Sequence, residues 1–202
     1  DIPTVRGNHD RQVASLAPDL MNASDRFTVE AISPRQRSWL GALPPQATIA
    51  DGIVAMHASP ASDTLYLLER IEHGELVRDR HDAIAVRLGA AGAARIVLTG
   101  HSHRPDLVAI EGGATIVNPG SVGCPAYDDD DPPHVSESGS PHARYAIVTP
   151  DAGGGGPSVL FVAVAYDHEE AARRAEASGR PEWAVALRTG FAVRPEPEAG
   201  RS

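Results

Sequence analysis

The chain has 202 residues, a formal net charge of −9 and one cysteine, Cys124. The net negative charge argues against a protein that coats nucleic acid, because phosphate backbones attract basic surfaces. No apolar run approaches the roughly 20 residues needed to cross a bilayer, and a lone cysteine, which cannot form an internal disulfide, fits a reducing, cytoplasmic compartment.

The first quarter of the chain alternates short apolar segments with breakers. We predict a strand over residues 2–5 and a helix over residues 12–21 that a proline interrupts. Ser33 followed by Pro34 is typical of a helix start, because serine caps the first turn and proline is tolerated there. Residues 48–56 are apolar around an Asp-Gly turn, which predicts a hairpin.

The remainder begins with a predicted crossover helix over 81–88 and a strand over 96–99. Four strands and two helices are then predicted, at residues 107–110, 115–117, 143–148, 159–166, 168–177 and 182–187. Strands that follow one another without helices suggest antiparallel sheet in this half. The pattern predicts an α/β (α+β) fold in which two sheets pack together with helices outside. We place one domain over residues 1–190 and expect residues 191–202, rich in Pro, Glu and Gly, to be a disordered tail.

Three predicted strands end in clusters that contain histidine. The clusters are Gly7-Asn8-His9-Asp10, Met56-His57-Ala58 and Gly100-His101-Ser102-His103. Neutral imidazole is a common ligand for divalent metals, and the ends of parallel strands meet at one edge of a sheet. The clusters together therefore predict a metal site, although any one of them alone is a weak signal.

The order of these clusters, followed by Asn118-Pro119-Gly120-Ser121-Val122-Gly123, resembles the calcineurin-like metallophosphoesterases. The match is strongest with their small bacterial and archaeal phosphodiesterase branch, and it runs from about Arg6 to about Gly190. The resemblance implies a four-layer αββα sandwich.

The resemblance also implies a site with two divalent metal ions. Asn8, His57 and His101 would be ligands of one ion, and His103 would be a ligand of the other. Manganese is the first choice, while iron, zinc and nickel also suit ligands of this kind.

His9 lies beside the ligand Asn8, and the resemblance implies that it protonates the leaving group, with Asp10 holding its ring. The implied reaction is hydrolysis of a phosphate mono- or diester by a metal-bound hydroxide, on a small phosphorylated substrate. Arg104 follows the last ligand and could contact a substrate phosphate, but a solvated loop arginine is an equally good interpretation. The oligomeric state stays open, a homo-oligomer included.

The family pattern has two further motifs, Asp-x-His and Gly-Asp, that supply metal ligands ahead of Gly-Asn-His-Asp. Only six residues precede Gly7, and neither motif is among them. We therefore expect the carboxyl-terminal portion of such a domain, with the amino-terminal strands and helices missing and with weak or no activity. The alternatives are a non-catalytic relative that serves as a binding or scaffold protein, and a purely structural zinc site.

The segment after the Asn-Pro-Gly-Ser turn departs from the family. We interpret residues 118–123 as a tight turn beside the site, and Cys124, Ala126 and Tyr127 stand where the family usually has Gln, Arg and Asp. The four aspartates at 128–131 predict a solvated, mobile insertion rather than a calcium site, because adjacent carboxylates point in different directions. No nearby feature would lower the pKa of the cysteine, so a nucleophilic role is not expected.

Overall fold

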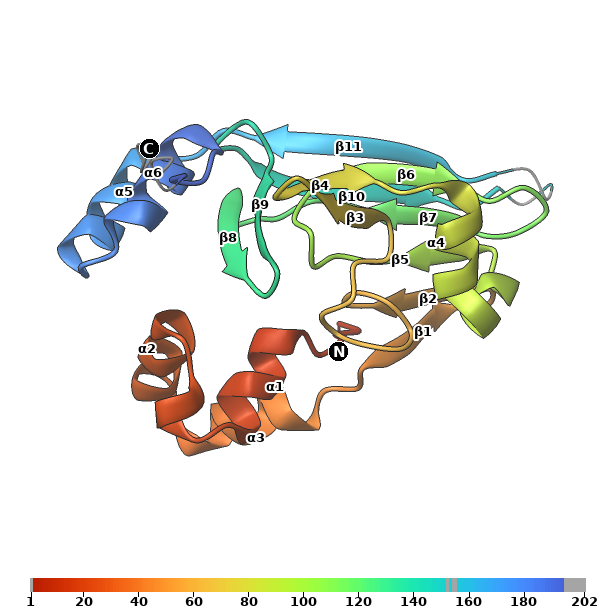
Figure 1. Ribbon diagram of the computed structural model, residues 1–202. Coiled ribbons are helices and arrows are strands. Elements are labelled where there is room, and N and C mark those ends of the chain that lie inside the picture. Colours follow the sequence, from red (N-terminus) through yellow and green to blue (C-terminus); the bar gives the residue numbers. More distant parts are fainter. Residues whose placement is uncertain (1, 152, 154–155, 195–202) are drawn as a thin grey trace, which may run out of the picture. The chain divides into compact units, whose positions relative to one another are not determined.

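The computed structural model describes residues 2–151, 153 and 156–194 and shows a mixed α/β protein (Figure 1). The chain divides into two compact units, each assembled from separate segments. Unit 1 contains the described residues of 1–68, 79–101 and 107–117. Unit 2 contains those of 69–78, 102–106 and 118 onward. No helix in this described part of the chain is long and apolar enough to span a membrane.

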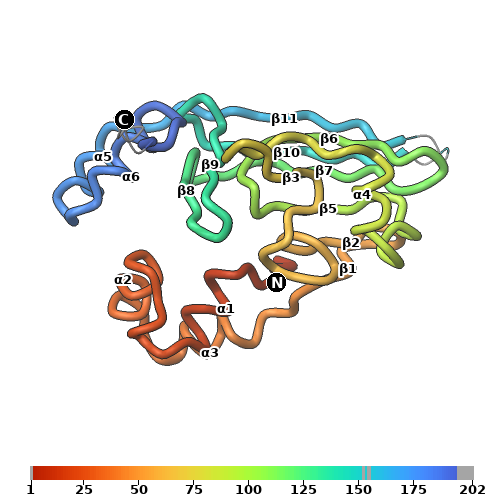
Figure 2. Tube along the Cα trace, in the orientation of Figure 1, coloured from red at the N-terminus to blue at the C-terminus, as the bar shows by residue number. Residues whose placement is uncertain are grey.

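Unit 1 begins with a group of short helices. Its helical segments are α1 (Asn8–Ser15), the 3-10 turn η1 (Pro18–Leu20), α2 (Ala23–Ala31), α3 (Pro34–Ala42), α4 (His81–Leu88) and the 3-10 segment η2 (Gly89–Ala93). Figure 2 traces α1, α2 and α3 as one group, and α1 contacts both of the others.

The predicted start of α3 is confirmed. Ser33 is the N-cap and Pro34 is the first helical residue. The Ser33 hydroxyl accepts a hydrogen bond from the Gln36 N–H, and the Gln36 side chain accepts one from the Ser33 N–H at 2.8 Å. This reciprocal pair satisfies two backbone donors near a helix start.

The strand predicted over residues 2–5 is not formed. Ile2 is 89% exposed, and Pro3 has no N–H to offer to a strand ladder. The segment is instead tied down just beyond this stretch, where the Arg6 N–H donates to the Pro44 carbonyl at 2.8 Å.

The helix predicted over residues 12–21 begins and ends earlier than expected, at Asn8 and Ser15. The Asp10 carboxylate accepts a hydrogen bond from the Gly7 N–H at 2.8 Å, which stabilises a helix start at this point. The Gly-Asn-His-Asp motif is therefore the first turn of a helix and not a loop.

The sheet of unit 1 has five strands. In spatial order they are β1 (Gln46–Ala50), β2 (Ile53–Met56), β5 (Ile96–Leu98), β7 (Thr115–Asn118) and β6 (Asp106–Ala109). The predicted β1–β2 hairpin is confirmed as antiparallel, and β2, β5 and β7 run parallel. The expectation of purely antiparallel sheet after β5 is therefore wrong for β7. Ile116 and Val117 are both buried, as in a parallel strand covered on both faces.

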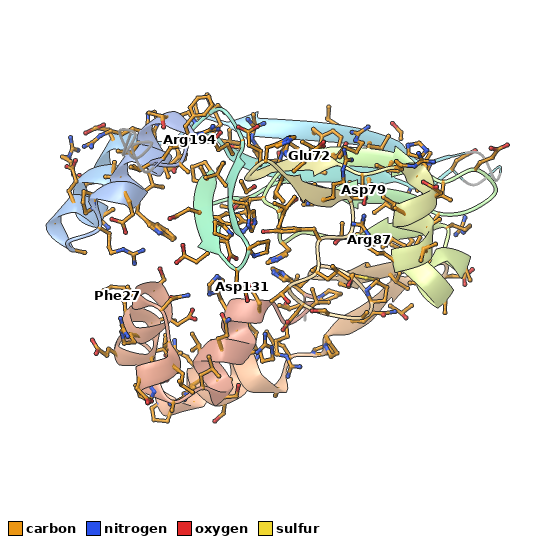
Figure 3. The ribbon with its side chains drawn as sticks, viewed as in Figure 1. Phe27, Glu72, Asp79, Arg87, Asp131 and Arg194 are labelled. Carbon is orange, nitrogen blue, oxygen red and sulfur yellow. The ribbon has the colours of Figure 1, made fainter. Side chains whose placement is uncertain are left out.

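Helix α4 makes the predicted crossover between the parallel strands β2 and β5. The largest core of unit 1 joins α4 to the sheet through Met56, Leu67, Leu68, Ile84, Leu88, Val97, Val108, Ala114 and Ile116. At the border of this core, Arg87 pairs with Asp79 and donates to the Tyr66 carbonyl at 2.7 Å (Figure 3).

Unit 2 contains a four-stranded sheet that includes the aspartate run. Its spatial order is β3 (Glu69–Glu72), β4 (Glu75–Arg78), β9 (Pro133–Glu137) and β8 (Ala126–Asp130). The aspartates were predicted to form a mobile insertion, but three of them lie in β8, and Asp131 lies at the turn into β9 (Figure 3). The hairpin forms because β9 buries His134 and Ser136 while the carboxylates stay exposed.

The predicted carboxyl-terminal elements of unit 2 are confirmed. They are the antiparallel pair β10 (Ala143–Thr149) and β11 (Ser158–Val164), and the helices α5 (His168–Ala177) and α6 (Pro181–Thr189). The two helices lie side by side in Figure 2 and bury Ala172, Ala184 and Leu187.

Residues 191–194, predicted to belong to a disordered tail, have fixed partners. The Ala192 N–H donates to Glu137 at 3.0 Å, and Arg194 pairs with Glu75 and Glu137 at 2.9 and 3.0 Å. Residues 195–202, the rest of that predicted tail, lie outside the described residues.

Candidate active site

Asn8 and His57 meet in unit 1 because a helix start and a strand end converge. Asn8 is the first residue of α1, and His57 directly follows β2. The His57 Nε2 lies 2.9 Å from the Asn8 Oδ1. A Cβ at Gly7 would lie 3.0 Å from two atoms of the His57 ring, so a side chain at this position would crowd the ring.

His101 joins the same group. It is the third residue after β5, and its ring centroid lies 5.1 Å from that of His57. Its Nε2 donates to the Thr64 carbonyl at 3.0 Å, which places the lone pair of the ring on Nδ1. The ring stacks on Tyr66 with centroids 4.6 Å apart. Sequence reasoning missed Thr64 and Tyr66, which belong to no motif.

These three residues offer an amide oxygen and two imidazole nitrogens, a donor set that suits a divalent ion. The 2.9 Å between Asn8 and His57 fits two ligands of one ion, since donors about 2.1 Å from a metal lie about 3 Å apart at a right angle. The described residues contain no group of three or more His, Cys, Asp or Glu side chains placed to hold a metal ion. A metal in unit 1 would therefore rely on the Asn8 amide as well as on the two imidazoles.

The electrostatic setting of His57 favours a ligand role. Burial lowers the pKa of His57 below its usual 6.5, and the charges of Asp10 and Asp63 offset this only in part. The ring is therefore neutral at neutral pH, which is the form that binds metals.

His9 has a partner that the sequence did not predict. Its Nδ1 lies 2.7 Å from the Asp25 carboxylate, whose side chain is only 3% exposed, whereas the His9 side chain is 60% exposed. The prediction that Asp10 holds this ring is wrong, because the Asp10 carboxylate is used by the Gly7 N–H at the start of α1. The one local signal for Asp25 was its place three residues after the N-cap Asn22.

His103 belongs to unit 2 and is held separately. Its Nδ1 donates to the Cys124 carbonyl at 2.9 Å, and its ring meets Tyr127 edge-on at 4.9 Å. Because Nδ1 donates to the Cys124 carbonyl, the lone pair of the His103 ring lies on Nε2. A histidine that binds a metal through Nε2 needs this arrangement. Burial raises the pKa of the Cys124 thiol to about 11, which agrees with the expectation that it is not a nucleophile.

Arg104 is not a freely solvated loop arginine, because its side chain has a backbone partner. Its guanidinium donates to the carbonyl of Leu76 in β4, within unit 2, and the residue is half-buried. The geometry therefore gives it the task of tying the loop after β5 to β4.

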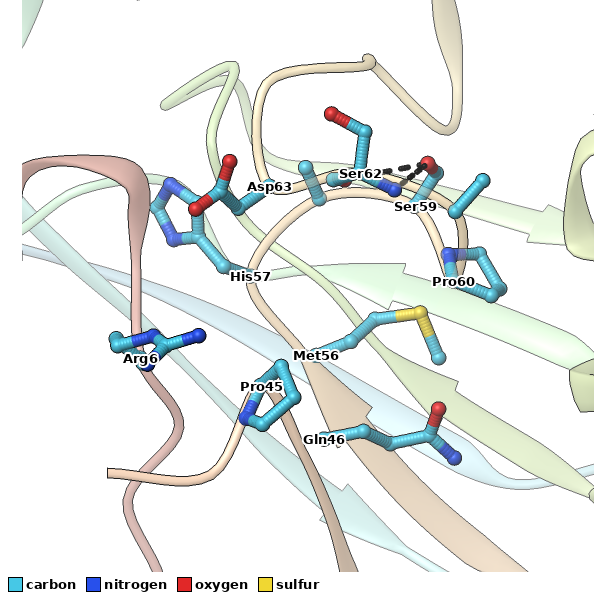
Figure 4. A pocket seen from close by; sticks show the side chains of 11 residues that line it. Arg6, Pro45, Gln46, Met56, His57, Ser59, Pro60, Ser62 and Asp63 are labelled. Carbon is cyan, nitrogen blue, oxygen red and sulfur yellow. Dashed lines mark hydrogen bonds between the residues drawn. The ribbon is translucent and has the colours of Figure 1, made fainter. Parts of the chain in front are cut away.

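A cavity of about 380 Å³ lies beside His57 in unit 1 (Figure 4). His57 and Asp63 stand close together at its edge, and Arg6 also lines it. The Arg6 Nε is buried without a hydrogen-bond partner, and Asp63 accepts two hydrogen bonds from Arg11, at 2.6 and 2.9 Å. A small ligand in this cavity would meet an imidazole, a carboxylate and a guanidinium.

An α/β fold that gathers imidazoles from the ends of parallel strands and an amide from a helix start is typical of metal-dependent hydrolases. A family model described as the calcineurin-like phosphoesterase superfamily domain matches residues 1–136. The match covers more than half of the sequence, and the chain belongs to this superfamily, whose members generally use divalent metals. No curated protein matches the chain.

The solved structures that share the fold include two with 20% and 22% sequence identity. A hypothetical protein from Pyrococcus horikoshii OT3 aligns with a TM-score of 0.67 at 20% identity, over 94% of this chain and 73% of that one. A metallophosphoesterase from Sphaerobacter thermophilus aligns with a TM-score of 0.62 at 22% identity, over 91% and 74% of the two chains. The predicted fold class, a mixed α/β metallophosphoesterase fold, is confirmed.

Proposed function

We propose that the protein is a metal-dependent phosphoesterase that hydrolyses a phosphate mono- or diester of a small molecule. The observation that supports this best is the convergence of Asn8, His57 and His101 in unit 1. A solvent-facing histidine held by a buried carboxylate belongs to the same unit. A purely structural metal site would have no use for such a pair.

In this proposal Asn8, His57 and His101 hold one ion, and His103 contributes to the site of a second. Bound divalent ions would polarise the phosphate and lower the pKa of an attacking water. Manganese is our first choice, because an amide oxygen mixed with imidazoles suits it, and iron, zinc and nickel share this preference. The single cysteine supports a cytoplasmic location.

In this proposal His9 is the general acid that protonates the leaving group. Asp25 engages its Nδ1, so Nε2 is the atom that would deliver a proton to the departing oxygen. The buried carboxylate fixes the orientation of the ring, as in other histidine–carboxylate pairs.

The test measures bound metal and the hydrolysis of bis-p-nitrophenyl phosphate by the 202-residue protein, with and without added manganese. We expect weak hydrolysis that depends on manganese. His101→Ala should weaken metal binding and hydrolysis together, by about 10-fold or more. His81→Ala, at the exposed first residue of α4, is the control and should change neither.

Two results would overturn the proposal. Manganese binding without hydrolysis would favour a non-catalytic relative that binds a partner. Folding that requires zinc, again without hydrolysis, would favour a structural metal site.

A further inference from the structure

Two histidines in the loop after β5 have an unusual backbone conformation. The φ angle is +66° at His101 and +58° at His103, within the left-handed region that residues other than glycine rarely adopt. Such conformations persist where the surroundings over-determine them, and they cluster at functional sites. The residue between the two histidines, Ser102, is fully buried.

Ser102 is held by hydrogen bonds both at its hydroxyl and at its backbone carbonyl. Its hydroxyl donates to the Glu69 carboxyl group at 2.6 Å and accepts from the Asn118 side-chain amide at 2.9 Å. Its backbone carbonyl accepts a hydrogen bond from the Ser136 hydroxyl. All four residues belong to unit 2, and they come from the start of β3, the loop after β5, the end of β7 and the second half of β9.

The group is also deeply buried. The exposed fractions are 5% for Glu69, 0% for Asn118 and 1% for Ser136. Polar groups are costly to bury, and apolar residues of similar volume often stabilise a core equally well, so packing alone does not account for a carboxyl group here. Asn118 extends the network, because its side-chain oxygen accepts from the Gly120 N–H at 3.0 Å. This contact accounts for the tight Asn-Pro-Gly turn.

We propose that a buried clamp positions His101 and His103, the chain neighbours of Ser102, for metal binding. The clamp consists of Ser102, Glu69, Asn118 and Ser136. The inference rests on the proposed function, since it concerns two of its metal ligands. The four are positioning residues, and none of them supplies a ligand atom. The clamp fixes the backbone on the amino-terminal side of His103, while the Cys124 carbonyl fixes its ring.

The test uses the full chain and compares variants that break the clamp with one that keeps it. Ser102→Ala removes the shared hydroxyl, and Ser136→Ala removes a single hydrogen bond, in case the first variant fails to fold. Glu69→Gln keeps an acceptor oxygen in a side chain of the same shape. Leu187→Ala, in the α5–α6 core of unit 2, is the control for a general loss of stability.

Two measurements separate positioning from stability. Nitrogen-15 NMR of the histidine rings in the metal-free protein, at a pH above the ordinary histidine pKa of about 6.5, reports which nitrogen of His103 carries the proton. Titration with cobalt(II), followed by its visible spectrum, reports metal affinity.

We expect wild type and Glu69→Gln to show one Nδ1-protonated form of His103. Ser102→Ala and, more weakly, Ser136→Ala should show a mixture of forms, with cobalt affinity reduced about 10-fold or more in Ser102→Ala. Leu187→Ala should lower thermal stability alone. The clamp is refuted if Ser102→Ala behaves like Leu187→Ala. Wild type that binds no cobalt would count against the proposed function, and the ring spectra would still decide whether the clamp positions His103.

Discussion

At the scale of single residues, the pair of His9 and Asp25 has the clearest chemical consequence. The carboxylate is buried and the imidazole is exposed, so the ring is anchored at Nδ1 while its other edge faces outward. Asp10 is nearer in sequence, yet its carboxylate caps the helix that carries His9. A proton donor needs a fixed orientation as well as a suitable pKa, and Asp25 supplies the orientation.

This pairing predicts how the rate depends on the leaving group. In His9→Ala, kcat/KM should fall about 100-fold or more for esters with poor leaving groups, and much less for p-nitrophenyl esters, whose departing oxygen needs little protonation. Asp25→Asn should show a smaller loss with the same trend. The measurement is kcat/KM across aryl phosphates of rising leaving-group pKa, with metal content determined for each variant.

Asp10→Asn is the matched comparison for this series. Whatever its effect on the absolute rate, it should leave the dependence on the leaving group unchanged, because the Asp10 carboxylate bonds Gly7 and not His9. Equal losses for good and poor leaving groups in His9→Ala would remove His9 from the general-acid role.

At the scale of elements, helix α3 is specified by its own first turn. None of its residues is fully buried, so the reciprocal bonds between Ser33 and Gln36 are an important part of what defines its start. The β8–β9 hairpin is the opposite case. Its aspartates have low strand propensity, and it forms because β9 buries one face in unit 2.

Ser33→Ala should therefore destabilise the protein by about 1 kcal/mol through loss of the helix cap. Urea unfolding should show a lower midpoint concentration of urea. The slope of the unfolding free energy against urea concentration should not change, because the folded state loses a cap and not its compactness. Ser15→Ala, at the exposed end of α1, removes a hydroxyl that donates to the Arg11 carbonyl and should change stability by less than about 0.5 kcal/mol. Equal effects of the two substitutions would contradict the capping argument.

At the scale of the whole molecule, the excess of acidic residues makes stability depend on pH. Asp63 is the clearest contributor, because it accepts two hydrogen bonds from Arg11, and these lower its pKa below the usual 3.8. The folded protein therefore binds a proton at this carboxylate less readily than the unfolded chain does. Its contribution to stability is present above pH 3.8 and is lost as the pH falls through the lower folded value.

Asp63→Asn should lower the free energy of unfolding at neutral pH by a few tenths to about 1 kcal/mol, since solvent screens this partly exposed ion pair with Arg11. The difference from wild type should shrink toward zero in acid, where Asp63 itself becomes neutral. Urea unfolding from neutral to acidic pH checks this. Asp82→Asn, in a fully solvated pair with Arg80, is the control and should have a smaller effect. If the difference in unfolding free energy between Asp63→Asn and wild type does not change with pH, Asp63 is not the source of this pH dependence.

The sequence alone determined the features that depend on neighbouring residues. The start of α3, the β1–β2 hairpin, the α4 crossover and the two final helices follow from capping residues, turn residues and apolar spacing. The order of the histidine-bearing motifs was sufficient to predict the calcineurin-like family, since several separated motifs are far more specific than one.

Only the tertiary structure decided which side chains meet. Asp25 reaches His9 across 16 positions of sequence, Glu69 reaches Ser102 across 33, and His57 reaches Asn8 across 49. Neither propensity nor periodicity encodes such pairs, because both describe a residue and its near neighbours. The partners are chosen when strand ends and helix starts are packed together, and the chemistry of the site depends on that packing.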